Sequence, residues 1–149
     1  TGSVADAAPL IVWNDHTGVV TMTYHPALKK YILVVSTADH YPSMTEEFDT
    51  YFLESDSITG PWSYVTYMQK YGPEAYFVHF PSKFSAVAID DAEDSSGNAT
   101  YSAFLMYSAN FAFHHGAEPV GSGYHMSLQQ SRLTLSAEFA ASLKSTTNN

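Results

Sequence analysis

The chain has 149 residues and a formal net charge of −9, from 15 acidic and only 6 basic residues. This charge repels phosphate backbones and anionic lipids, so we expect neither nucleic acid nor a membrane as a partner. With 45% hydrophobic and 15% aromatic residues, the composition is that of a folded chain rather than a disordered one. No cysteine is present, which excludes disulfides, thiolate metal sites and a cysteine nucleophile.

The first half of the chain predicts four strands in succession. A β-rich run covers residues 19–24, and the turn after it leads into a second strand at residues 31–37. A third strand is expected at residues 50–54. A tight Gly-Pro turn then leads into an outermost strand at residues 62–68. Together they predict one four-stranded antiparallel unit over about residues 17–70.

A second unit follows the break at Tyr71-Gly72-Pro73. We expect its strands at residues 75–80, 100–108 and 124–135, so the unit spans about residues 74–135 and lacks a fourth strand. In the C-terminal segment, residues 136–149, a short helix is predicted with Ser136 as its N-cap.

The two units carry the same motif. Tyr24-His25-Pro26 precedes the second strand of the first unit, and His79-Phe80-Pro81 occupies the matching place in the second unit. A β unit repeated at roughly fifty to seventy residues is typical of propeller blades. We therefore predict an all-β fold, a β-propeller fragment of about two four-stranded antiparallel blades. Since a closed ring needs about four to eight blades, a companion polypeptide is a possible partner.

A family resemblance supports this fold. The turn Asp56-Ser57-Ile58-Thr59-Gly60-Pro61-Trp62 resembles the corner between outer strands in glycosidase-like propellers of the five-bladed arabinanase and xylosidase type. Four further segments look like the C-terminal part of secreted fungal propeller proteins grouped with carbohydrate-active enzymes: residues 24–31, 50–55, 72–77 and 122–132. The resemblance covers most of residues 19–140. It implies an extracellular protein with a polysaccharide or oligosaccharide partner, and the sequon Asn98-Ala99-Thr100 fits secretion.

Glycoside hydrolysis needs two carboxyl groups that face one pocket. Asp15 and Glu74 each stand just before the first strand of a unit, where the inner strands of a propeller converge. We therefore predict Asp15 and Glu74 as catalytic carboxyl groups. The alternatives are a turn-forming side chain for Asp15 and a solvated charge for Glu74.

Elimination at a uronate needs a base, an acid and a cation that neutralises the carboxylate. His79 is the predicted catalytic base, Lys83 the cation and Tyr124 the acid, and His16 and His25 complete the predicted substrate-binding set with Lys83 and Tyr124. The alternative for strand histidines is packing in the core.

The sequence thus leaves three functions open. The chain is glycoside hydrolase-like or polysaccharide lyase-like, it is a non-catalytic sugar-binding propeller, or it is a structural segment whose site lies on other blades. We expect no catalytic metal and no cofactor, and a structural cation stays open.

Overall fold

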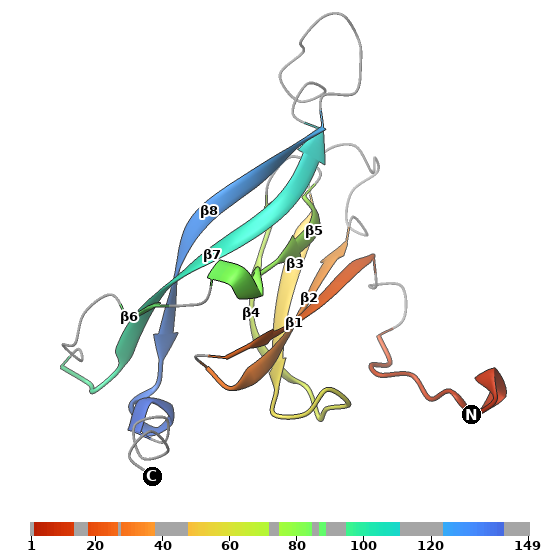
Figure 1. The fold of residues 1–149 in the computed structure, drawn as a ribbon, viewed down its shortest axis with the longest axis horizontal. Helices are drawn as coiled ribbons and strands as arrows, with labels where there is room; N and C mark the ends of the chain where they lie inside the picture. Colours follow the sequence, from red (N-terminus) through yellow and green to blue (C-terminus); the bar gives the residue numbers. More distant parts are fainter. Residues whose placement is uncertain are drawn as a thin grey trace, which may run out of the picture.

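The computed structural model describes residues 2–13, 18–26, 28–37, 48–71, 75–84, 87–88, 95–110 and 124–141. Its described strands form two antiparallel sheets (Figure 1). The prediction of a β fold with two successive antiparallel units is therefore confirmed.

Sheet one is a four-stranded meander in which every strand pairs with its neighbour in the chain, in the order β1-β2-β3-β4. Its strands are β1 (Val19–His25), β2 (Lys30–Thr37), β3 (Asp49–Ser55) and β4 (Ser63–Met68). The β-branched run in β2 favours an extended backbone, because branched side chains pack well on a pleated surface. All four strands lie where the sequence predicts them.

Sheet two is built around β7 (Ala99–Asn110), which pairs along all 12 of its residues with β8 (Tyr124–Leu135). The two strands form a long twisted ribbon that projects beyond the other strands (Figure 1). The other edge of β7 is shared by β5 (Tyr76–His79) and β6 (Val87–Ala88). The sequence does not predict β6. With β6, sheet two contains four described strands, whereas the sequence predicted three and no fourth.

A short helix follows β8 and occupies residues 137–141 of the described chain. The hydroxyl of Ser136 accepts the backbone N–H of Phe139 at 3.3 Å, so Ser136 acts as the predicted N-cap. Asn98 Oδ1 accepts the N–H of Ala137 at 3.2 Å, which satisfies another free donor of the first turn. In the described part of the chain no helix is both long enough and apolar enough to span a bilayer.

The main core lies between the two sheets. Ile32, Val34 and Phe52 of sheet one and Leu105 and Tyr107 of sheet two are buried in one cluster. In β1 and β5, which are in contact, the hydroxyl of Thr21 donates a hydrogen bond to the carbonyl of Val78. The first strands of the two sheets therefore lie side by side, which is the arrangement that positions the site.

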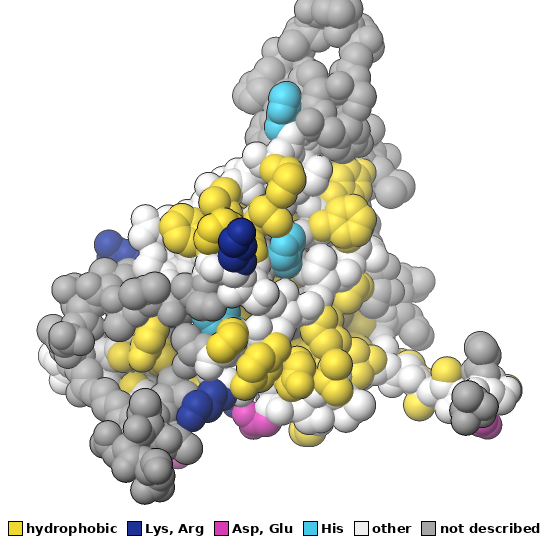
Figure 2. Space-filling model, viewed as in Figure 1, with side chains coloured by type: hydrophobic (Ala, Val, Ile, Leu, Met, Phe, Trp, Pro, Cys, Tyr) yellow, Lys and Arg dark blue, Asp and Glu magenta, His cyan; other side chains and the backbone are white. Residues whose placement is uncertain are grey.

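Sheet one is apolar on its other face as well. Leu33, Val35 and Leu53 form a second cluster there, against which Ile11 and Trp62 pack. Alternate residues of β2 point to opposite faces, so burial of Val34 and Val35 alike means that β2 is covered on both sides. Further apolar side chains on this face are exposed: Val20, Met22, Tyr24, Tyr64 and Tyr67. Figure 2 shows apolar side chains gathered over sheet one.

Candidate functional site

An open groove of about 610 Å³ lies where the two sheets meet, between β1 and the segment formed by β5 and the 3-10 turn η2 (Ser82–Phe84). Its described lining comes from only these elements and the residues that flank them: Met22, Thr23, Tyr24, Pro26, His79, Pro81, Ser82 and Lys83.

The groove brings the two copies of the repeated motif together. Tyr24 and Pro26 line it from the first copy, and His79 and Pro81 line it from the second. Behind the groove, the buried ring of His25 meets the ring of Phe80 edge-on, with centroids 6.4 Å apart and planes at 76°. The motif therefore supplies both the groove's lining and its packed base.

A hydrogen bond fixes the orientation of the His79 ring. His79 Nδ1 lies 2.6 Å from the carbonyl oxygen of Phe77. A carbonyl oxygen can only accept, so Nδ1 carries the proton in this bond, and in the neutral ring Nε2 keeps the lone pair. His79 is half-buried and lines the groove. Its Nε2 is thus the ring nitrogen suited to accept a proton.

The backbone before His79 is irregular. Four residues of β5, from Tyr76 to His79, lie opposite only three residues of β7, from Met106 to Ser108, so β5 contains a bulge. Within the bulge, Phe77 has φ of 54°, a value that bulky residues rarely adopt. Since each extra residue in a strand reverses the face of those that follow, the bulge determines which way His79 points.

Lys83 lies in η2, just after β5. The turn is closed by the N–H of Phe84, which donates to the carbonyl of Pro81 at 3.0 Å. The ring of Phe84 packs on Phe104 of β7, with centroids 5.9 Å apart, and so holds the turn against sheet two. Lys83 is exposed, and no ion pair forms between it and any other described residue. Figure 2 shows a basic side chain beside a histidine on this face of the molecule.

Two of the other predicted binding residues, His25 and Tyr124, do not lie at His79. His25 is only 1% exposed, and burial lowers its pKa, so its ring takes the packing role that we set beside binding. Tyr124 is the first residue of β8, and its side chain lies outside the described part. His79 pairs with Met106, whose partner on β8 is Leu128. Tyr124 therefore begins about 13 Å farther along the ribbon, at about 3.3 Å per residue.

Three predicted site residues, Asp15, His16 and Glu74, lie outside the described residues. The predictions of a carboxyl pair and of a contact from His16 therefore stay predictions.

Tyr24 is a groove residue that the sequence analysis did not select. It is 44% exposed, and its ring lies 5.0 Å from the ring of Tyr31. The signal was present in the repeat, because Tyr24 occupies the position in its motif that His79 occupies in the other.

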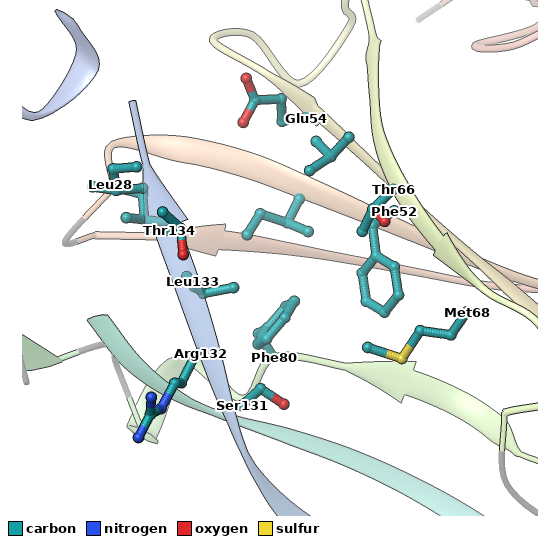
Figure 3. A pocket seen from close by; sticks show the side chains of 13 residues that line it. Leu28, Phe52, Glu54, Thr66, Met68, Phe80, Ser131, Arg132, Leu133 and Thr134 are labelled. Carbon is teal, nitrogen blue, oxygen red and sulfur yellow. The ribbon is translucent and has the colours of Figure 1, made fainter. Parts of the chain in front are cut away.

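A second cavity, of about 240 Å³, opens between the sheets farther from β1 (Figure 3). Phe52, Phe80 and Leu133 face it, whereas the charged ends of Glu54 and Arg132 point away from it (Figure 3). Because its walls are apolar, this cavity is a gap in the inter-sheet core and offers no acid or base.

Among the described residues, no group of three or more histidine, aspartate or glutamate side chains could hold a metal ion. In the comparisons with known proteins, no protein-family model, no curated protein and no solved structure matches this chain. The resemblance to glycosidase-like propellers therefore stays a prediction.

Proposed function

We propose that this chain is part of an extracellular, carbohydrate-active β-propeller that cleaves glycosidic bonds of a plant or microbial polysaccharide. The observation that carries the proposal is the groove at which both copies of the motif meet. His79, Tyr24 and the exposed Lys83 line this groove, and the hydrogen bond from Nδ1 fixes the orientation and tautomer of the His79 ring.

Three features of the fold support a propeller. The chain forms two successive antiparallel sheets, the first strands of these sheets are in contact, and β2 is buried on both faces. A strand buried on both faces is typical of a sheet packed between two others. A further sheet from a companion polypeptide would cover the exposed face of sheet one. The native mass of the purified protein tests this point, since a partner adds its own mass to that of the chain.

The groove suits the chemistry because a saccharide is cleaved by proton transfer at ring carbons or at the glycosidic oxygen. His79 lines the groove and can act as its base or acid, and the flat exposed ring of Tyr24 can stack on a pyranose. Hydrolysis would add the carboxyl groups of Asp15 and Glu74, and elimination would need none. No cofactor enters either reaction.

The test is an assay of the protein against neutral and acidic polysaccharides, with release of reducing ends as the readout. His79→Gln should lower the rate about 100-fold or more, because general acid–base catalysis contributes about that much. The matched control is His125→Gln, an exposed histidine on β8 that does not line the groove. An unchanged rate in His79→Gln would show that the groove is not the active site.

The second candidate function is sugar binding without cleavage. It is favoured by the exposure of Tyr24 and by its pairing with Tyr31, which together offer an aromatic platform at the groove's edge. Calorimetry would then show saccharide binding that Tyr24→Ala abolishes, while no polysaccharide is cleaved.

A further inference from the structure

The groove is basic in an acidic protein. Lys83 is the one lysine or arginine among its described lining residues, and no aspartate or glutamate lines that described part. The chain as a whole carries a net charge of −9. Lys83 forms no ion pair with another described residue, so its positive charge can attract an anionic group.

The side chains around Lys83 fit one kind of anionic sugar. His79 Nε2 is the proton acceptor because Phe77 holds Nδ1 as a donor. Tyr24 offers a hydroxyl that can donate a proton from the opposite wall, on β1. A base, an acid and a cation are the groups that remove the acidic proton beside a carboxylate and release an oxygen.

We infer that the groove binds a 4-linked uronate and cleaves its chain by β-elimination, an inference that rests on the proposed function. Lys83 pairs with the uronate carboxylate, and His79 Nε2 takes the proton from C5. The C5–H electron pair forms the C4–C5 double bond, and the bond between C4 and the glycosidic oxygen breaks. Tyr24 gives its proton to that leaving oxygen, and exchange with water restores both side chains.

Phe77 is a positioning residue in this scheme, since its carbonyl fixes the tautomer of His79. The bulge is what allows the bond, because it turns the Phe77 carbonyl toward the ring two residues later. Without this hydrogen bond, the neutral ring of His79 could carry its proton on either nitrogen.

The tautomer is tested without any substrate. Nitrogen NMR of isotope-labelled protein distinguishes the two neutral tautomers, and a spectrum of His79→Gln identifies the His79 signals. We expect a protonated Nδ1 and an unprotonated Nε2. The opposite tautomer would overturn the role of Nε2 as base.

The substrate class is tested with polygalacturonate as the acidic polymer and arabinan as the neutral one. We expect polygalacturonate to yield products with the ultraviolet absorbance of an unsaturated uronate. Lys83→Met should lower that rate at least about 100-fold, the usual effect of removing one group that stabilises transition-state charge. The control is Lys70→Met, at an exposed lysine outside the groove.

The outcomes separate the two proposals. Cleavage of arabinan, or of polygalacturonate without unsaturated products, would overturn the uronate elimination and leave the proposed function standing. An equal rate in Lys83→Met would also overturn the inference. If neither polymer nor any other polysaccharide is bound or cleaved, both proposals fall.

Discussion

Sheets one and two differ in how their strands pair beside the groove, since β1 pairs with β2 without a shift and β5 is bulged. In sheet one each strand pairs with its neighbour in the chain, and both faces of β2 are packed. In sheet two one edge of β7 is divided between β5 and β6, and β5 is bulged. Both His79 and Lys83 follow that bulge. Sheet one has a register shift of its own, between Phe52 and Leu53 where β3 pairs with β4, but neither residue lines the groove. Sheet one therefore contributes Tyr24 from a strand paired without a shift, and sheet two contributes His79 and Lys83 from the segment that follows a bulge.

The two sheets nevertheless depend on one core. Leu105 is fully buried at the centre of the inter-sheet cluster, whereas Leu128 on the adjacent strand points to the other face and is 48% exposed. Substitutions in either sheet therefore test how far the two sheets depend on this shared core.

The largest effect is expected for Leu105→Ala. Removing this buried side chain should lower the free energy of unfolding by about 2 to 5 kcal/mol, because it leaves a cavity between the sheets. Urea denaturation measures the change. Leu128→Ala is the control and should cost less than about 1 kcal/mol. Equal losses from the two substitutions would contradict a shared core.

The bulge is tested at Phe77, which is 59% exposed and has positive φ. Phe77→Val should lower the free energy of unfolding by about 1 to 2 kcal/mol, because a branched side chain resists this backbone conformation. Phe77→Gly should be neutral or stabilising by up to about 1 kcal/mol, since glycine adopts positive φ without cost. Both are measured by urea denaturation. If Phe77→Val leaves the free energy of unfolding unchanged, β5 is not bulged at Phe77. The difference in strand pairing beside the groove would then be lost.

The buried histidine predicts a dependence on pH. Burial lowers the pKa of His25 below the 6.5 of an unfolded chain, so the unfolded state binds the proton more readily. The stabilising effect is complete above pH 6.5 and is lost as pH falls below it, by at most about 1.4 kcal/mol per pH unit. Denaturation at several pH values measures this slope, and His25→Gln should reduce it. A slope that is unchanged in His25→Gln would place the titrating group elsewhere.

The smallest effect is expected at the contact between the Tyr71 segment and β8. Tyr71 donates a hydrogen bond to Gln129 Oε1 at 2.9 Å, and Gln129 Nε2 donates to the hydroxyl of Tyr107 at 3.3 Å. Tyr71→Phe should cost about 1 kcal/mol, the usual net value of one hydrogen bond. Urea denaturation at neutral pH measures the loss.

Burial and the neighbouring Tyr107 raise the pKa of Tyr71 to about 12. The unfolded chain therefore loses this proton first, so stability should fall as pH rises above 10. Tyr71→Phe should remove that part of the alkaline loss, and an unchanged alkaline curve would contradict it.

Much of the fold could be predicted from the sequence, because strand-forming runs between turn residues are a local signal. The predicted and observed bounds of β8 coincide, and those of β2 differ by one residue. The two-residue strand β6 could not be predicted, since a periodic pattern needs more residues than Val87 and Ala88 provide. The bulge was also hidden, because no sequence pattern marks positive φ at a phenylalanine.

The site could be predicted only in part, because the sequence does not give the register between strands. His79 and Lys83 lie close together in the sequence, and both line one groove as predicted site residues. His25 was placed beside them, yet it points into the core, since neighbouring residues of a strand face opposite sides. Tyr124 was chosen in place of Tyr24 because only the pairing of β7 with β8 shows how far along the ribbon it begins.

The connectivity of sheet one bears on the order in which the molecule assembles. Its hairpins join consecutive segments, so each can close at a small entropic cost before the next is added. Sheet two must bring β5 to β7 past an intervening stretch that contains η2 and β6. Contacts between residues close in the chain form faster than distant ones. In refolding experiments the first sheet should therefore acquire hydrogen-exchange protection earlier, and would act as the template on which the second condenses.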